Sequence, residues 1–287
     1  MIASSQPKAL SRGRTRRFVA GLLFNAFLLV VLCLVMAPFV WMISASFLPD
    51  GGATKIPPVF IPLHPTLDQY HRLFAGMNFG RSFLNSFIVA SAVTVSSLLV
   101  NSLAAFAFAK YRFTGRKRLF GWLLSLMVIP GQVTMFPVFL LLNRLHLINN
   151  YWGLIIPGMA SVFGIFLFRQ FMEDIPDELI EAARLDGCGD FGIFARIVLP
   201  LCTPILVTIA LFTFLGTWND FMWPLILMSN NDMYTLPVTL ANLIGEHQAD
   251  TELMMAGAVL TTLPVMVLFL FLQKYYIRGI MAGGVKG

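Results

Sequence analysis

Six long apolar stretches constrain this chain more than any other feature of its sequence. They run approximately over residues 18–43, 82–109, 119–142, 152–171, 203–228 and 253–275. A helix needs about 20 residues to cross a hydrocarbon core about 30 Å thick, so each stretch is long enough to span a membrane. Only 12% of the 287 residues are charged, against roughly 25% in soluble domains, and the alternation typical of membrane barrels is missing. We therefore expect an all-α polytopic membrane protein with six transmembrane helices.

The basic residues between these stretches predict the orientation of the chain. Lys and Arg residues number sixteen in the N-terminus, the second and fourth interhelical connectors and the C-terminus, but four in the remaining connectors. Because positive residues accumulate in cytoplasmic segments, both termini are predicted to be cytoplasmic. The net charge of +6 then reflects topology and gives no reason to expect nucleic-acid binding. The first stretch is too long for a signal-peptide core and is interpreted as an uncleaved anchor.

This orientation gives a simple organisation along the chain. Residues 1–17 form a basic cytoplasmic N-terminus, and residues 18–80 comprise the first transmembrane helix and its external loop. Residues 81–278 form the transmembrane core, and residues 279–287 form a cytoplasmic tail.

The cytoplasmic connector 173–200 is unusual because it holds seven of the chain's fourteen carboxylates. Pro176 suits the first position of a helix, and acidic residues follow it at the positive end of the helix dipole. Gly187 favours a left-handed C-cap that stops this helix. Asp190 is predicted to cap a second short helix over 191–198, which Pro200 ends. The connector is thus expected to be an ordered helix–hinge–helix hairpin.

One side of the first hairpin helix suits contact with another protein. Leu179, Ala182, Ala183 and Asp186 share that side, and acidic residues flank it. A helix that binds anionic lipid headgroups would be rich in Lys and Arg, whereas this one is net acidic. A protein partner is therefore the favoured interpretation, and a connector packed only on its own chain is the alternative.

Two segments resemble the permease subunits of ABC importers. "EAARLDG", followed by "IVLPL", resembles the EAA loop of that family, and "FLFRQFMEDIPDELIEAARLDG" and "GTWNDFMWPLIL" resemble its carbohydrate, maltose-transporter-like branch. The resemblance implies the type I ABC importer permease fold with an EAA coupling loop at 173–200. It also implies that this loop seats in an ATP-hydrolysing subunit. The coupling residues expected from the motif and its helix are Glu178, Glu181, Ala182, Ala183, Arg184, Leu185, Asp186 and Gly187.

The same resemblance implies a set of partners in a bacterial or archaeal plasma membrane. These are a second homologous permease chain, commonly non-identical, two ATP-binding-cassette ATPase subunits that carry ATP and Mg, and an extracytoplasmic solute-binding protein with its sugar. This chain has no G-x-x-x-x-G-K-[ST] phosphate loop. We expect it to bind no cofactor or metal and to have no catalytic residue, so it is not itself an enzyme.

A polar cluster in the fifth stretch is a candidate for the substrate path. Asp220 is the one acid placed within a predicted span, and such a residue is by default a functional candidate. Trp218, Asn219 and Trp223 surround it and suit a carbohydrate, because indoles stack on sugar rings and the amide and carboxylate bind hydroxyls. The alternatives are a gate or helix contact and an interfacial anchor.

Two further polar features fall inside predicted spans. Ser86, Thr94, Ser97 and Asn101 lie roughly on one face of the second span, where small polar residues serve helix packing more often than transport. Pro130 is predicted to break the third span near its middle, beside a cavity.

Other functions are less favoured. An autonomous secondary transporter would need more intramembrane charge than Asp220 and a matching pair of broken helices. A polytopic membrane enzyme would need a catalytic cluster. A permease of the same family for glycerol phosphate or another non-sugar solute stays open.

Overall fold

The computed structural model describes residues 9–55, 59–246 and 250–284, and every regular element in these ranges is a helix. Residues 1–8 of the predicted basic N-terminus and residues 285–287 of the predicted tail lie outside the described residues. The longer elements are α1 (Ala9–Ala45), α2 (Asp68–Gly76), α3 (Phe79–Lys110), α4 (Arg116–Ser125), α5 (Gly131–Arg144), α6 (Tyr151–Gly158), α7 (Val162–Glu173), α8 (Asp177–Leu185), α11 (Thr203–Trp218), α12 (Met222–Leu227), α13 (Leu236–Glu246) and α14 (Thr251–Gly284). Shorter turns are η1 (Leu126–Val128), α9 (Asp190–Ile193), η2 (Phe194–Val198), α10 (Leu199–Leu201) and η3 (Asn231–Met233).

The chain forms two compact units, which are described separately. Unit 1 comprises Met1–His71 with Ala249–Val259, and unit 2 comprises Arg72–Gln248 with Leu260–Gly287. In unit 1, the segment after α1 folds back. The rings of Tyr70 and Phe47 lie 5.5 Å apart between centroids in a tilted arrangement, and the Tyr70 hydroxyl lies 2.8 Å from the Ser46 hydroxyl. Glu252 is buried there, and its carboxylate accepts a 2.6 Å hydrogen bond from the Ala53 backbone N–H.

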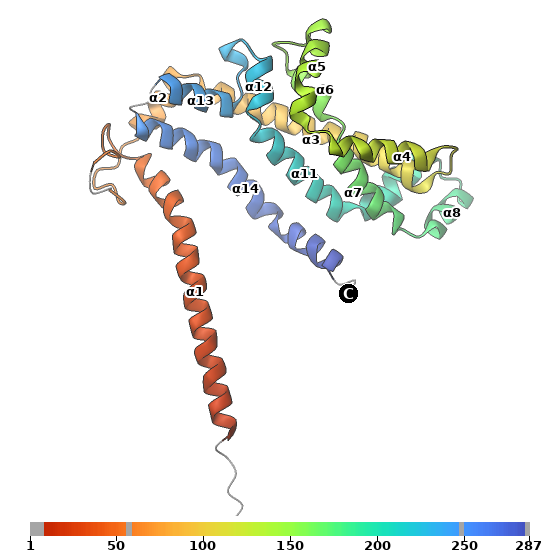
Figure 1. Cartoon of the computed structure of the whole chain (residues 1–287), viewed down its shortest axis with the longest axis horizontal. Helices are drawn as coiled ribbons and strands as arrows, with labels where there is room; N and C mark the ends of the chain where they lie inside the picture. Colours follow the sequence, from red (N-terminus) through yellow and green to blue (C-terminus); the bar gives the residue numbers. More distant parts are fainter. Residues whose placement is uncertain (1–8, 56–58, 247–249, 285–287) are drawn as a thin grey trace, which may run out of the picture. The chain divides into compact units, whose positions relative to one another are not determined.

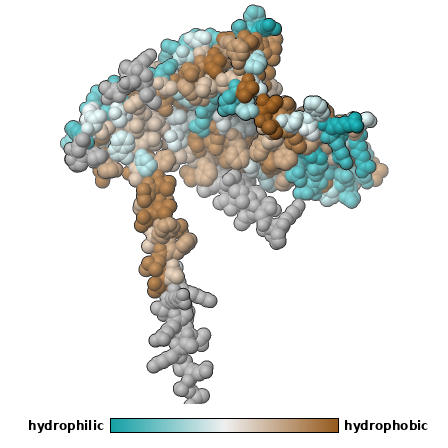
Figure 2. All heavy atoms as spheres, viewed as in Figure 1, coloured by the Kyte–Doolittle hydropathy of each residue, from teal (hydrophilic) through white to brown (hydrophobic). Residues whose placement is uncertain are grey.

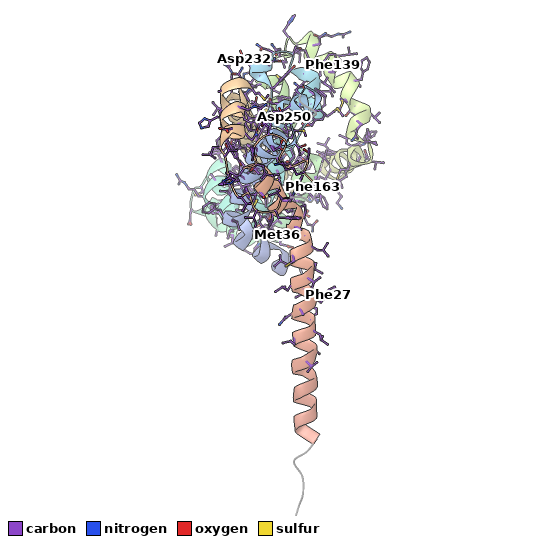
Figure 3. All side chains as sticks on the ribbon, turned by 90° about the vertical axis from the view of Figure 1, so that its left-hand side faces the viewer. Phe27, Met36, Phe139, Phe163, Asp232 and Asp250 are labelled. Carbon is purple, nitrogen blue, oxygen red and sulfur yellow. The ribbon has the colours of Figure 1, made fainter. Side chains whose placement is uncertain are left out.

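Helix α1 carries apolar side chains around its whole circumference. Phe27 is 63% exposed and Leu34 is 72% exposed, and Figure 3 shows side chains such as Phe27 projecting away from the helix. The visible atoms of α1 are hydrophobic in Figure 2. Such a surface needs lipid or another apolar partner, as the predicted membrane anchor requires.

The six predicted spans include three continuous helices and three bent pairs. The continuous candidates are Val19–Ala45, Phe79–Lys110 and Thr251–Phe271. The bent pairs are Arg116–Val128 with Gly131–Arg144 (103°), Tyr151–Gly158 with Val162–Glu173 (40°) and Asp190–Leu201 with Thr203–Trp218 (81°). Six spans are reached if each pair counts as one. The predicted break at Pro130 is confirmed. The stretches 152–171 and 203–228 are also interrupted, which the sequence did not indicate.

The breaks that the prediction missed are stabilised by side chains acting on the backbone. At the first, the Ser161 hydroxyl accepts a hydrogen bond from the Gly164 N–H at 3.2 Å and so caps α7. The Asn101 side chain on α3 accepts a 2.9 Å hydrogen bond from the Ser161 N–H. A further interruption lies within 203–228, where α11 ends at Trp218 and α12 begins at Met222. There the Asp220 side chain accepts hydrogen bonds from the backbone at the start of α12.

Helix α3 is the central element of unit 2 and packs against α6, α7, α11 and α13 (Figure 1). Its polar face is used for packing, as the sequence favours: Ser86, Thr94, Ser97 and Asn101 are all at most 9% exposed. Asn101 donates to the Ser97 hydroxyl at 2.7 Å. Because these groups bond to each other or to backbone, α3 can be buried without orphaned donors.

Each end of α3 organises one end of unit 2. At its start, Arg81 Nε donates to the Asp232 carbonyl at 2.9 Å, and Asn85 Nδ2 donates to the carbonyls of Asp232 and Tyr234 at 2.9 Å each. At its end, Phe106 and Phe108 belong to an apolar core that includes residues of α7, α8 and η2. Hydrophilic atoms gather at this end, which carries α8 (Figures 1 and 2).

Candidate functional site

The acidic connector forms the predicted hairpin, and its hinge has a well-defined geometry. Helix α8 ends where Gly187 adopts a φ of 83°, in the left-handed region. The Cys188 N–H bonds to the Ala183 carbonyl at 2.9 Å and the Gly187 N–H bonds to the Arg184 carbonyl at 3.0 Å. This pair of bonds is the Schellman motif, which a glycine at this position accommodates without steric cost. The predicted left-handed C-cap is confirmed.

The second half of the hairpin differs from the prediction in two respects. Gly189, not Asp190, occupies the N-cap of α9, and the Asp190 carboxylate instead pairs with Arg184 at 3.2 Å. The helical path also continues beyond the predicted end, through the π-helical turn η2 and α10 to Leu201. Pro200 is tolerated because it lies in the first turn of α10, where its missing N–H leaves no bond unmade.

One face of α8 is buried against the chain itself. Ile180 and Ala183 are 5% and 7% exposed and belong to the core that contains Phe106 and Phe194. Of the two alanines that the sequence assigned to a partner contact, Ala183 therefore packs inward and Ala182 is exposed. One face of α8 therefore packs on the protein itself, and the other face is open.

A buried lysine fixes the start of α8. Lys110 is the last residue of α3, and its side chain is only 4% exposed. Its ammonium donates to the Ile175 carbonyl at 2.5 Å and to the Asp177 carboxylate at 2.7 Å. The hydrogen bond and charge of Lys110 hold the pKa of the Asp177 carboxyl below its usual value. A single side chain thus ties the central helix to the first residue of α8.

A second tie joins α3 to the hinge of the hairpin. The Arg184 guanidinium lies 5.8 Å from the centre of the Tyr111 ring, within cation–π range, while it also pairs with Asp190. Burial, and then the hydrogen bond with the Asp190 carboxylate, raise the pKa of Tyr111 above its usual value. Residues 110 and 111, at the end of α3, therefore contact both helices of the hairpin.

The open face of the hairpin combines acids with two large apolar side chains. Leu185 is 89% exposed and Phe191 is 73% exposed. The remaining predicted coupling residues on this face are also exposed: Glu178, Glu181, Ala182, Arg184, Asp186 and Gly187. Phe191 was missed from the sequence, although its place beside the hinge, after Asp190, was an available signal.

The predicted membrane cluster divides into two environments. Trp218 is fully buried, stacks on Phe214 at 5.8 Å and donates its indole N–H to the Thr261 carbonyl of α14 at 3.1 Å. The exposed Asn219 caps the end of its own helix by donating to the Leu215 carbonyl at 2.8 Å. Trp218 thus joins α11 to α14, and Asn219 makes its contact within α11.

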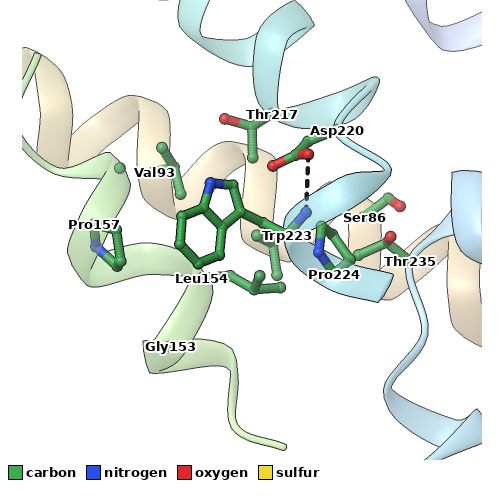
Figure 4. Close-up of a pocket in the computed structure, with 12 residues that line it drawn as sticks. Ser86, Val93, Gly153, Leu154, Pro157, Thr217, Asp220, Trp223, Pro224 and Thr235 are labelled. Carbon is green, nitrogen blue, oxygen red and sulfur yellow. Dashed lines mark hydrogen bonds between the residues drawn. The ribbon is translucent and has the colours of Figure 1, made fainter. Parts of the chain in front are cut away.

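Asp220 and Trp223 instead line a cavity of about 150 Å³ between α3, α6 and the start of α12. One carboxylate oxygen of Asp220 accepts hydrogen bonds from the backbone N–H groups of Met222 and Trp223 at 3.1 and 3.3 Å. Figure 4 shows the Trp223 indole among the residues that line this cavity, with Asp220 close to the Trp223 backbone. The structure therefore brings together two of the four predicted path residues around one space.

Comparisons with known proteins relate this chain to membrane components of transport systems. The profile of the family described as "Binding-protein-dependent transport system inner membrane component" matches residues 97–281. The arabinooligosaccharides transport system permease protein AraQ of Halalkalibacterium halodurans is 38% identical, over 93% of this chain and 95% of the relative. The galactooligosaccharides transport system permease protein GanQ of Bacillus subtilis is 35% identical, over 96% and 98%. The sn-glycerol-3-phosphate transport system permease protein UgpE of Yersinia pestis is 36% identical, over 88% and 93%.

A solved structure shares the same fold. A chain of a bacterial ABC transporter involved in the import of the acidic polysaccharide alginate superposes with a TM-score of 0.82 at 25% identity, over 95% of this chain and 100% of that chain. The matched family is the membrane-embedded part of the transporter and not its ATPase. This chain belongs to the family of binding-protein-dependent ABC transporter permeases, the multi-pass inner membrane components of bacterial importers.

Proposed function

We propose that this chain is one of two permease subunits in an importer that moves oligosaccharides across the inner membrane by alternating access. ATP is hydrolysed on two partner ATPase subunits, which hold ATP and Mg. The observation that carries this proposal is the anchored hairpin with an exposed apolar tip, because such a surface is built to be covered by another protein. We infer that the substrate is an oligosaccharide because relatives that are 35–38% identical are named as oligosaccharide permeases.

The tip of the hairpin has the composition of a docking element. Burying a Leu or Phe side chain contributes about 1.5–3 kcal/mol, so covering Leu185 and Phe191 would stabilise the complex substantially. Five acids at positions 177–190 surround them, with Arg184 as the one base. We infer a groove on the ATPase with an apolar floor and a basic rim. The seven exposed predicted coupling residues and Phe191 are seated in it, while Ala183 packs inward on this chain.

Movement of the docked hairpin would reach the spans by two connections. Lys110 links the first residue of α8 to α3, which packs on α7 and α11. The other connection is the helical path α9–η2–α10, which joins α11 at the 81° bend near Cys202. Because the first connection is a direct side-chain tie and the second is a continuous helical path, we expect a displacement at the tip to be transmitted rather than absorbed.

The opposite end of unit 2 suits the solute-binding protein. The segment between α12 and α13 is held to α3 by the Arg81 and Asn85 hydrogen bonds, and the Ser82 and Thr239 hydroxyls lie 2.7 Å apart. The segment is thus an ordered surface. We place it outside the membrane and both termini in the cytoplasm, as the Lys and Arg distribution predicts.

The second permease chain would cover apolar surface that this chain leaves open. Along α3, Val95 and Leu99 are 68% and 54% exposed although the opposite face of the helix is buried. We propose that a homologous, non-identical chain and lipid share such surfaces.

The substrate path is proposed to run beside the 218–223 segment. Asp220 and Trp223 would line it directly, whereas Trp218 and Asn219 would hold the helices that form its wall. A second candidate solute is glycerol phosphate, which a relative's name supports. The four residues carry one negative charge and no positive one, which disfavours a phosphate ester in this segment and favours an uncharged sugar.

The docking role is tested by replacing the apolar side chains of the hairpin tip with polar ones. Leu185→Ser and Phe191→Ser are each expected to weaken co-purification of the ATPase subunits at least tenfold. Phe113→Ser is the control, since Phe113 lies in the neighbouring connector and is 42% exposed. If both tip variants retain the ATPase as well as Phe113→Ser does, the hairpin is not the docking element.

A further inference from the structure

The cavity beside Trp223 contains polar groups that keep free hydrogen-bonding capacity within the described part of the chain. It is lined by Ser86, Val89 and Val93 of α3, by residues of α6 and by Thr217, Asp220, Trp223, Pro224 and Thr235. All of these belong to unit 2. Among the residues of this wall, Asp220 and Trp223 belong to the four path residues expected from the sequence, whereas the Thr217 and Thr235 hydroxyls have no assigned role.

Three oxygen groups in this wall have free hydrogen-bonding capacity. Thr235 is 3% exposed, yet its hydroxyl has no partner among the described residues. Leaving a buried hydroxyl unpaired costs stability unless something else binds it. The Thr217 hydroxyl also makes no hydrogen bond within the described part of the chain, and only one oxygen of Asp220 is used by the α12 backbone.

Apart from the Ser86 hydroxyl, which accepts a 2.7 Å hydrogen bond from the Leu236 N–H, the rest of the cavity wall is apolar. Figure 4 shows the Trp223 indole flanked by Val93, Leu154 and Pro157, with Thr217 and Asp220 at one edge and Thr235 on the side of Pro224. A sugar ring has the matching character, because its C–H faces are apolar and its hydroxyls point outward from the rim. Ligand sites commonly combine a mostly apolar wall with a few convergent polar groups.

The size and the charge of the cavity restrict which solutes it can bind. Its volume of about 150 Å³ is roughly ten times the space that one water needs. Its lining holds one carboxylate and no Lys, Arg or His. An anionic solute would be repelled, and a purely apolar one would leave the three oxygen groups unpaired.

We propose that this cavity binds one uncharged sugar ring of the translocated oligosaccharide, with Trp223 against the ring face and Thr217, Thr235 and Asp220 bonding its hydroxyls. The inference rests on the proposed oligosaccharide-import function and adds a defined binding position to it. Thr217 and Thr235 act as specificity-determining residues, since a site built around sugar hydroxyls discriminates against solutes that lack them.

The test uses isosteric variants in the assembled importer. The importer, with both permease chains and the ATPase subunits, is reconstituted in proteoliposomes with its binding protein and radiolabelled arabinotriose or galactotriose. Thr217→Val and Thr235→Val each remove one hydroxyl at constant volume. Thr208→Val is the matched control, because Thr208 is also on α11 but donates to the Pro204 carbonyl at 2.9 Å and does not line the cavity.

The measured quantity is sugar imported per ATP hydrolysed. We expect each cavity variant to lower it about three- to tenfold, the effect of one lost hydrogen bond, while binding-protein-stimulated ATPase activity and the Thr208→Val ratio stay at the wild-type level. The melting temperature of Thr235→Val should be unchanged or higher, because an unpaired buried hydroxyl is removed.

Three results would overturn the inference. The first is a wild-type ratio in both cavity variants, which leaves the proposed function intact. The second is a parallel loss of uptake and ATPase activity, or a lower melting temperature in Thr235→Val, which would indicate a structural role. The third is the absence of ATP-dependent uptake of either trisaccharide by the wild-type importer, in which case the proposed function fails as well.

Discussion

Gly187 offers a direct test of the hairpin because its backbone, and not its surroundings, demands glycine. Its φ is 83°, and a Cβ built there would meet no atom within 4 Å. Gly187→Ala therefore creates no clash with neighbouring residues. An L-residue held in the left-handed region costs about 1–2 kcal/mol, so the substitution penalises the hinge conformation by that amount.

Gly192 provides a control, because an alanine there is expected to change the stability of the hairpin in the opposite direction. It lies within α9, and a Cβ there also meets no atom within 4 Å, but its φ is not in the left-handed region. Because alanine is favoured over glycine by up to about 1 kcal/mol within helices, Gly192→Ala should leave the hairpin unchanged or slightly more stable. The two variants add the same methyl group five residues apart.

The assay is binding of the purified ATPase subunit to the permease in nanodiscs, at equal protein stability. If the hinge strain is released by rearrangement of the tip, Gly187→Ala weakens binding by about five- to thirtyfold, the equivalent of 1–2 kcal/mol. Gly192→Ala binds as wild type. Equal affinity for Gly187→Ala, Gly192→Ala and wild type would refute the claim that this hinge sets the docking geometry.

Three further predictions concern the ties that position the hairpin and the spans. Lys110→Met removes a charged donor and should cost about 1.5–3 kcal/mol and reduce sugar import per ATP, whereas Lys117→Met, at an exposed lysine, changes neither the melting temperature nor this ratio. Because the pKa of Asp177 is lowered in the folded chain, its pair with Lys110 stabilises the fold above the ordinary carboxyl pKa near 4 and loses this effect as pH falls below it. The contribution is small because Asp177 is 66% exposed, and melting curves of Asp177→Asn should lack this acid-dependent component. Trp218→Phe keeps the ring but loses the bond to Thr261, so it should lower the melting temperature, at about 0.5–1.5 kcal/mol, with import per ATP retained; loss of import at unchanged stability would place Trp218 in the path instead.

The sequence predicted those features whose causes are local. Apolar stretches about 20 residues long mark candidate spans because the bilayer sets their length. Pro130 marks a break because proline lacks a backbone hydrogen-bond donor. Gly187 marks a hinge because glycine is the residue type that enters the left-handed region without steric cost. Each of these causes acts within a few residues of the chain.

The missed features depend on residues far apart in the sequence. The break at Ser161 is stabilised by Asn101, sixty residues earlier, and the start of α8 is fixed by Lys110, sixty-seven residues before Asp177. The burial of the Ala183 side chain depends on a core to which α3 and η2 contribute residues. No local pattern distinguishes Lys110 from the other basic residues of its connector. Only tertiary packing assigns these roles.

ATP-dependent uptake by the reconstituted complex tests the central claim most directly. Proteoliposomes contain this chain, its partner permease and the ATPase subunits, with loaded binding protein on the external side. We predict uptake of arabinotriose or galactotriose that requires both ATP and the binding protein and is lost with Leu185→Ser together with Phe191→Ser. Uptake driven by an ion gradient without ATP, or uptake unaffected by the two substitutions, would contradict it.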